Sequence, residues 1–146
     1  MIEIPESDHQ LAARLAEQAG ELLVELRQRM FSEGASPWRV MDAGDLAAHR
    51  FLMDGLRSAR PDDSVLSEEG ADDRRRLRAE RVWIVDPLDG TNEYGEYGRS
   101  DWAVHVALWE GERLSAGAVA LPAVGRVFRT SPPSTPPRVT RDRPRM

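Results

Sequence analysis

The sequence contains no cysteine and no lysine, since all 20 of its basic residues are arginine. Without cysteine there is no disulfide, no thiolate zinc site and no cysteine nucleophile. The lack of lysine excludes a Schiff-base lysine and the lysine-bearing phosphate loop. No apolar run approaches the about 20 residues that a membrane span needs, and the N-terminus lacks a basic-then-apolar signal pattern. We therefore expect a soluble, cytoplasmic protein that does not contact a membrane.

The formal net charge is −5 over 146 residues, and it is unevenly distributed. Residues 131–146 hold four Arg and one Asp, a local charge of +3, so that subtracting it leaves −8 on residues 1–130. An acidic body attracts metal cations better than polyanions. No nucleic-acid partner is expected, and binding through the arginines of 131–146 is disfavoured because no aromatic residues stand between them.

Hydrophobic periodicity predicts two helices and several strands. The first helix is expected over about 8–31 after a capping box of Ser7 and Gln10. The second is expected to start near Asp45 and to stop before Pro61. A charged helical turn is expected over Asp72–Glu80, and strands are expected at Val65–Ser67, Val82–Val85, Asp101–Trp109, 115–121 and 124–130, the last two separated at Pro122. The fold class is α+β, with residues 1–130 in one domain.

Residues 131–146 differ in composition from the rest. Five of these 16 residues are Pro and few are apolar, so the segment cannot bury enough surface to offset its ordering entropy. We predict a disordered Pro/Arg-rich tail.

Acidic residues follow or begin three of the predicted elements. Glu68-Glu69 comes directly after one strand, Asp86-Pro87-Leu88-Asp89-Gly90-Thr91 comes after the next, and Asp45 opens the second helix. Taken singly, an Asp-Pro is usually a turn and a Glu-Glu pair is usually solvated surface. Their occurrence in this order favours a shared site, because ligands bind where strands end.

The spacing within Asp86–Thr91 has a mechanical reason. Pro87 stiffens the turn so that Asp86 and Asp89 face one site, and Gly90 lets the backbone approach a ligand. A helix that begins near Thr91 would present N–H groups to a phosphate. Converging carboxylates repel one another without a cation, and hard oxygen ligands select Mg²⁺.

Other residues are interpreted as structural. Trp83, Trp102 and Trp109 are expected in the core, and Trp38 in the core or at a pocket rim. His105 is expected to be half-buried and not a ligand. The run Arg74–Arg76 is expected to be a solvated face.

The motifs WIVDPLDGTNEY at 83–94 and SEEG at 67–70 resemble the signature of the inositol monophosphatase superfamily, and the similarity covers about residues 8–130. Together with DWAVHVALW at 101–109 they most resemble its CysQ-like branch, the 3′(2′),5′-bisphosphate nucleotidases. The resemblance implies the layered sugar-phosphatase fold, here its N-terminal half, with two helices packed on a largely antiparallel sheet.

Site residues carry over by position as what the resemblance implies. Two or three Mg²⁺ ions are implied, together with a Thr91–Asp45 pair that orients and deprotonates the attacking water. The implied metal ligands are Glu68, Asp86, the carbonyl of Leu88, and Asp89; the implied phosphate-binding residues are Gly90 and Thr91, and Glu69 is implied to lie behind the ligands.

The sequence departs from the family pattern in three ways. Gly44 stands where the family usually has Thr, and the lysine common upstream is missing. The family's second half, with its Trp-Asp motif, has no counterpart in residues 131–146. A truncated or frameshifted reading frame would explain both the length and the tail.

The expected function is Mg²⁺-dependent hydrolysis of a small phosphomonoester, with adenosine 3′,5′-bisphosphate as first choice. An inositol or sugar monophosphatase is the alternative substrate class, and a non-catalytic metal-binding fragment is the alternative role. Any apolar surface left uncovered favours a homodimer.

Overall fold

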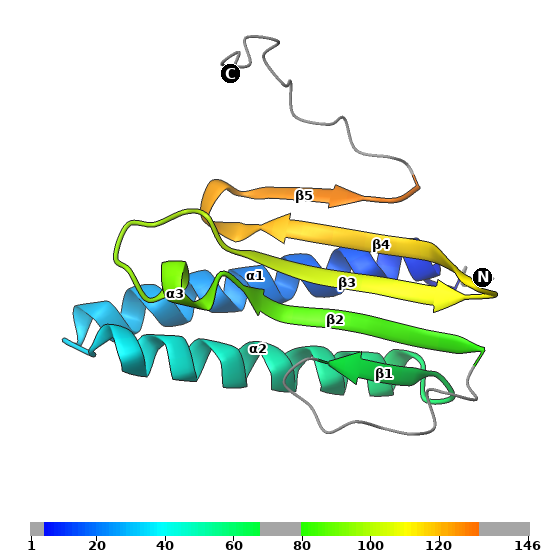
Figure 1. The fold of residues 1–146 in the computed structure, drawn as a ribbon, viewed down its shortest axis with the longest axis horizontal. Helices are drawn as coiled ribbons and strands as arrows, with labels where there is room; N and C mark the ends of the chain where they lie inside the picture. Colours follow the sequence, from blue (N-terminus) through cyan, green and yellow to red (C-terminus); the bar gives the residue numbers. More distant parts are fainter. Residues whose placement is uncertain (1–4, 68–79, 132–146) are drawn as a thin grey trace, which may run out of the picture.

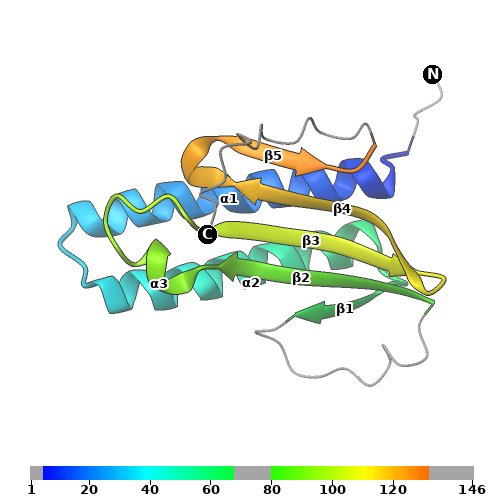
Figure 2. The same ribbon diagram turned by 45° about the horizontal axis from the view of Figure 1, so that its top comes forward.

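The computed structural model describes residues 5–67 and 80–131. Within this part of the chain, five strands form one sheet in the order β1-β2-β3-β4-β5, and two long helices run roughly along the strand direction behind it (Figures 1 and 2). The elements are α1 (Asp8–Ser32), α2 (Pro37–Ala59), β1 (Ser64–Ser67), β2 (Arg81–Asp89), α3 (Thr91–Tyr94), β3 (Ala103–Glu110), β4 (Arg113–Leu121), the 3₁₀ turn η2 (Pro122–Val124) and β5 (Arg126–Arg129). The predicted α+β class is confirmed.

The two long helices begin at side-chain caps. Ser7 accepts from the backbone N–H of Gln10, and the Gln10 side chain accepts from the N–H of Ser7, which confirms the predicted capping box of α1. The prediction that α2 starts near Asp45 is wrong, because α2 starts at Pro37 with Ser36 as its N-cap. Proline suits the first position of a helix, where its missing N–H costs nothing.

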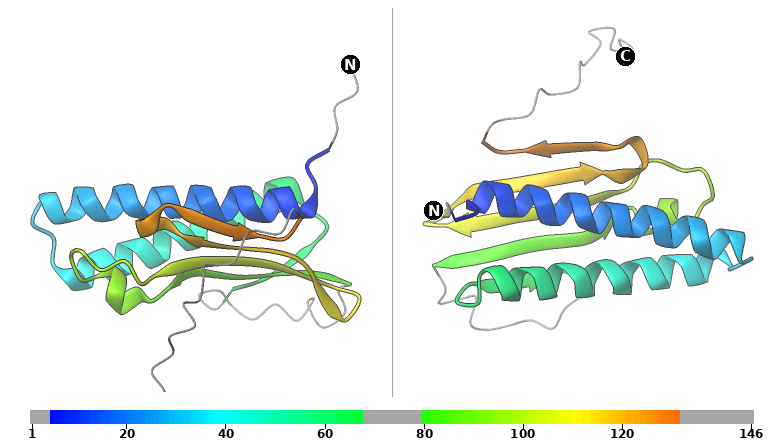
Figure 3. Two further views of the ribbon diagram at one scale, coloured as in Figure 1. Left: turned by 90° about the horizontal axis from the view of Figure 1, so that it is seen from above. Right: turned by 180° about the vertical axis from the view of Figure 1, so that it is seen from behind.

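The sheet is largely antiparallel, as predicted. Only the pairing of β1 with β2 is parallel among the described strands, with Ser67 beside Val85, and the other three pairings are antiparallel. Both α1 and α2 cover the same face of the sheet (Figure 3), α1 over β3, β4 and β5 and α2 over β1 and β2. The opposite face is not covered by either helix.

The core lies between this helix pair and the sheet. Trp83 and Trp102 are buried there as predicted, together with the inward side chains of β3 and β4. The prediction for Trp109 is wrong, because 40% of its surface is exposed. A register irregularity between Leu108 and Trp109 precedes it, and alternation along β3 turns it away from the helices. Trp38 is 72% exposed and is not in the core.

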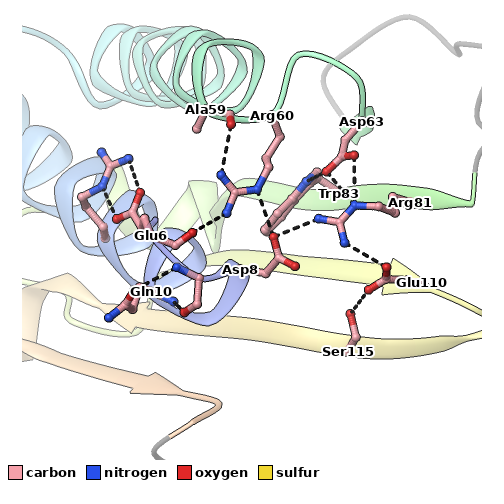
Figure 4. A network of polar contacts seen from close by, with 12 residues as sticks. Glu6, Asp8, Gln10, Ala59, Arg60, Asp63, Arg81, Trp83, Glu110 and Ser115 are labelled. Carbon is pink, nitrogen blue, oxygen red and sulfur yellow. Dashed lines mark hydrogen bonds and ion pairs between the residues drawn. The ribbon is translucent and has the colours of Figure 1, made fainter. Parts of the chain in front are cut away.

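A network of charged side chains joins the elements at the start of β2 (Figure 4). Arg81 donates to Asp8 on α1, to Asp63 before β1 and to Glu110 at the end of β3, at 2.9–3.1 Å. The indole N–H of Trp83 also donates to Asp63, at 2.8 Å. Four segments distant in sequence are therefore held together by one guanidinium and its partners.

Some predictions fall outside the described residues. These are the helical turn predicted over Asp72–Glu80 and the tail from residue 132 onward. Of the predicted turn only Glu80 is described, and it is not helical. Within residues 5–67 and 80–131, neither long helix has an apolar stretch that would cross a bilayer.

Candidate active site

The end of β2 carries the carboxylates predicted to form the site. The strand runs on through Asp86, Pro87 and Leu88 to Asp89, with a register irregularity opposite β3 between Asp86 and Asp89. The prediction of a strand that stops at Val85 before a turn is therefore wrong. Proline is tolerated at such a bulge because the ladder hydrogen bond is already interrupted there. Asp86 is half-buried, whereas the Asp89 side chain is 60% exposed.

Gly90 redirects the chain from β2 into α3. Its φ of 85° lies in the left-handed region, and a β-carbon there would come within 2.9 Å of the carbonyl oxygen of Asp101. Both the conformation and the close approach require glycine. The predicted helix near Thr91 is confirmed as the single turn α3.

Thr91 joins this turn to α2. Its hydroxyl lies 3.2 Å from Oδ1 of Asp45 and also 3.2 Å from the carbonyl oxygen of Leu88. Asp45 is half-buried in the third turn of α2, so it reaches the site from within a packed helix and not from a flexible helix end. The two residues predicted to form the catalytic pair are thus brought within hydrogen-bond distance from 46 positions apart.

His105 was not predicted to belong to the site, yet it contacts Asp89. Its Nε2 lies 3.1 Å from Oδ2 of Asp89, and the imidazole is 40% exposed. Antiparallel pairing of β2 and β3 also places His105 opposite Asp86. The alternation along β3 could have revealed this, because it directs His105 to the face without helices.

The strand that leads to the Glu68-Glu69 pair ends beside β2. Ser67 is buried, and its Oγ lies 3.2 Å from Nδ1 of His49 on α2. In the sheet Ser67 pairs with Val85, the residue before Asp86. Glu68, Glu69 and Arg74–Arg76 lie outside the described residues.

The end of β2 offers oxygen donors of the kind that a divalent cation binds. Among residues 5–67 and 80–131, no three carboxylate or imidazole side chains gather closely enough to hold a metal ion alone. The donors present are nevertheless all hard oxygens, namely the carboxylates of Asp86 and Asp89 and the carbonyl of Leu88. Mg²⁺ keeps several waters and binds through one or two carboxylates, so this set fits it.

An open pocket of about 520 Å³ adjoins Asp89. Its lining comes from the turn after β2, from β3 and from the end of β4: Asp89, Gly90, Glu93, Asp101, Trp102, Ala103, His105, Val119 and Leu121. The volume suits a small ligand, and Asp89 with Gly90 forms one wall.

Comparison with known proteins is consistent with this geometry. The family model of the inositol monophosphatase family matches residues 5–132. A 3′-phosphoadenosine 5′-phosphate phosphatase of Mycobacterium leprae is 52% identical over 85% of this chain and 49% of its own length. The 3′(2′),5′-bisphosphate nucleotidase CysQ of Escherichia coli O157:H7 is 34% identical over 79% of this chain and 48% of its own. The solved structure of Mycobacterium tuberculosis SuhB superposes with a TM-score of 0.66 at 29% identity, over 83% of this chain and 42% of that one.

The chain spans about half the length of the curated relatives it matches. The family model covers all of the described residues, including α1, the segment Asp86–Thr91 and β5. Phosphatases of the matched family depend on metal ions, generally Mg²⁺. This chain belongs to the inositol monophosphatase family.

Proposed function

We propose that the chain carries the water-activating half of a Mg²⁺-dependent phosphomonoesterase. The observation that carries the proposal is the 3.2 Å contact between the Thr91 hydroxyl and Oδ1 of Asp45, beside two carboxylates of the same turn. A carboxylate that accepts from a hydroxyl can take up its proton, which makes the hydroxyl oxygen a base toward a neighbouring water.

In the proposed reaction, Thr91 and Asp45 orient the attacking water. The Thr91 oxygen accepts a proton from the water while its own proton moves to Oδ1 of Asp45. The second contact of Thr91, to the carbonyl of Leu88 at 3.2 Å, limits rotation of the hydroxyl about Cα–Cβ. Attack on phosphorus then displaces the alcohol directly, with no covalent enzyme intermediate.

Asp86, Asp89 and the Leu88 carbonyl are the proposed ligands of Mg²⁺, with Glu68 as a further ligand and two or three ions in all. When bound, Mg²⁺ polarises the phosphoryl oxygens and lowers the pKa of the attacking water. The N–H groups of Gly90 and Thr91 are proposed to hold a phosphate oxygen, because the first N–H groups of a helical turn lack intrahelical acceptors. The Gly90 conformation turns the backbone at that point.

The proposed substrate is adenosine 3′,5′-bisphosphate, cleaved to AMP and phosphate. This choice is supported by the named activities of the relatives at 52% and 34% identity. An inositol or sugar monophosphate is the alternative. A homodimer is also proposed, because Ile84, Trp109 and Leu114 are 37%, 40% and 62% exposed on strands of the sheet. Light scattering of the purified chain tests it, and a monomeric mass at all concentrations would contradict it.

The test is phosphate release from adenosine 3′,5′-bisphosphate by the purified chain, with Mg²⁺ and with EDTA. Asp89→Asn keeps the shape of the side chain and removes its charge. Asp54→Asn is the matched control, since Asp54 is an exposed residue of α2 away from the turn. Inositol 1-phosphate is run in parallel as the competing substrate.

Release that requires Mg²⁺, survives Asp54→Asn and is lost in Asp89→Asn supports the proposal. Faster release from inositol 1-phosphate would show that the substrate is an inositol or sugar monophosphate and would leave the proposed mechanism unchanged. Mg²⁺ binding without release from either substrate, by a chain that is folded by circular dichroism, would contradict the enzymatic role and favour a metal-binding fragment.

A further inference from the structure

Arg27 lies outside the motif that identifies the family, yet its side chain reaches the loop that follows the motif. From the C-terminal part of α1, its Nε donates to the carbonyl of Tyr94 at 2.7 Å and its Nη1 to the carbonyl of Arg99 at 2.8 Å. Its Nη2 donates to the carbonyl of Glu93 at 3.2 Å and to that of Glu96. One guanidinium thus holds four carbonyls of residues 93–99, a segment that starts two residues after Thr91.

Aromatic rings surround the same guanidinium. Its carbon lies 5.5 Å from the ring centroid of Tyr94, 5.7 Å from that of Trp102 and 6.0 Å from that of Phe31. A cation this close to ring faces is attracted by their quadrupoles. Tyr94 and Trp102 also pack edge to face at 4.9 Å. Arg27 is therefore fixed by contacts on the faces and at the edges of its planar group.

Two of these three aromatic residues also pack against the backbone beside the proposed catalytic pair, Tyr94 through its ring and Trp102 through its Cα and Cβ. Tyr94 packs against Gly44, the residue before Asp45, where a β-carbon would lie 2.4 Å from Cε1 of the ring. Trp102 packs against Gly90, the residue before Thr91, where a β-carbon would lie 3.2 Å from Cα and from Cβ of Trp102. A shift of the Tyr94 ring or of the Trp102 backbone would therefore displace the backbone next to a catalytic side chain.

We propose that Arg27 is the positioning residue for the Asp45–Thr91 pair. By holding the carbonyls of residues 93–99, it keeps Tyr94 against Gly44 and Trp102 against Gly90, and so fixes the distance between the two catalytic oxygens. This inference rests on the proposed function. Lysine replaces Arg27 only in part, because a single ammonium lacks the planar fork that reaches four carbonyls at once.

The test compares Arg27→Gln and Arg27→Lys with Arg29→Gln, which removes an exposed arginine two residues further along α1. In hydrogen exchange of the whole chain, Arg27→Gln is expected to accelerate exchange of residues 90–101 by about tenfold or more, and to leave β3 and β4 unchanged. Arg29→Gln is expected to change neither segment. Unchanged exchange at 90–101, or equal acceleration in all segments, would overturn the proposal.

Kinetics with adenosine 3′,5′-bisphosphate and Mg²⁺ give the second readout. Misplacement of a catalytic pair lowers the rate of the chemical step, so Arg27→Gln is expected to lower kcat by about tenfold or more and to change KM by less than about twofold. The kcat of Arg27→Lys is expected to lie between those of the wild type and Arg27→Gln. In a further variant, Arg27→Ala, added guanidinium ion is expected to restore part of the lost kcat. A rise in KM at unchanged kcat would overturn the positioning role.

The two readouts separate this proposal from the proposed function. If the wild-type chain releases no phosphate, the enzymatic proposal fails, and hydrogen exchange alone still decides whether Arg27 orders residues 90–101. If the wild-type chain is active and exchange at 90–101 responds but kcat does not, Arg27 orders the loop without positioning the pair, and the inference is wrong.

Discussion

Gly44 lies directly against the ring of Tyr94, so close that a β-carbon at position 44 would be 2.4 Å from Cε1 of the ring. The ring cannot easily move away. The Tyr94 hydroxyl donates to the carbonyl of Leu23 at 2.7 Å, and burial raises the pKa of this phenol, which keeps it protonated as a donor. The space that a threonine would occupy before Asp45 is thus taken by Tyr94. The departure of Gly44 from the family pattern has a steric reason.

We expect Gly44→Ala to lower the free energy of unfolding by about 1–3 kcal/mol, because overpacking a buried position forces side chains from their rotamers. Gly44→Thr should lower the free energy of unfolding further than Gly44→Ala. Denaturant unfolding measures both, with Gly117→Ala as control, since a β-carbon at Gly117 meets its nearest atom at an ordinary 3.4 Å. A Gly44→Thr chain as stable as the wild type would show that Tyr94 does not occupy this space.

The network around Arg81 predicts a loss of stability in acid. Partial burial opposes ionisation of Asp8, but hydrogen bonds from Arg81 and Arg60 outweigh it and lower the pKa of Asp8 below its usual 3.8. Because the pKa of Asp8 is lowered, the stabilisation from its ionised carboxylate is fully present well above pH 3.8. This stabilisation is lost as the pH falls through that value toward the pKa in the folded state. The free energy of unfolding should therefore fall from about pH 5 downward.

Asp8→Asn removes the charge of this side chain and with it the acid dependence of the free energy of unfolding. We expect a loss of about 2 kcal/mol at pH 7, as for a hydrogen bond to a charged partner, and a flatter profile between pH 5 and pH 3. The measurement is urea unfolding across this range, with Glu17→Gln on the exposed face of α1 as control. A variant that is as acid-sensitive as the wild type would assign the effect to other carboxylates.

Local patterns in the sequence predicted most of the fold. The three- and four-residue spacing along α1 and the alternation along β3 each reflect burial on one face, and burial is what the structure shows for Leu11, Leu15, Val104 and Val106. The start of α2 was missed although Ser36 is a good N-cap and Pro37 suits the first helical position. Trp109 was assigned to the core because it lies on a predicted strand, against the alternation that directs it outward.

The candidate site could be predicted only in part. The turn Asp86–Thr91 is contiguous in sequence, so its residues were found from the motif. Arg27 was not found, because its contacts span at least 66 positions and no local pattern encodes them. His105 was also missed, although the alternation along β3 directs it to the face without helices, where it contacts Asp89. The contact of Asp45 with Thr91 spans 46 positions and was expected from the family resemblance, not from spacing.

Thr91→Val tests the hydroxyl apart from the shape of the side chain. Valine keeps the branched β-carbon but cannot donate to Asp45 or to the carbonyl of Leu88. Loss of a general acid–base group lowers rates by about 10²–10⁴-fold, so we expect phosphate release to fall within this range. Thr91→Ser keeps the hydroxyl and should retain most of the activity. Equal activities of the two variants, both folded by circular dichroism, would exclude a role for the hydroxyl.

Removal of the metal should lower the stability of the chain even where no activity is measured. A ligand that binds only the folded state stabilises it by RT ln(1 + [L]/Kd), about 2.7 kcal/mol at one hundred times Kd. We therefore expect Mg²⁺ to raise Tm in a concentration-dependent way and EDTA to reverse the rise. Asp86→Asn and Asp89→Asn should each weaken the shift, because each removes one of the two carboxylates offered by the end of β2. Asp54→Asn should keep the full rise in Tm. A Mg²⁺ shift of unchanged size in the Asp86→Asn and Asp89→Asn double variant would place the metal elsewhere, since without those charges the turn keeps only the Leu88 carbonyl among its proposed ligands.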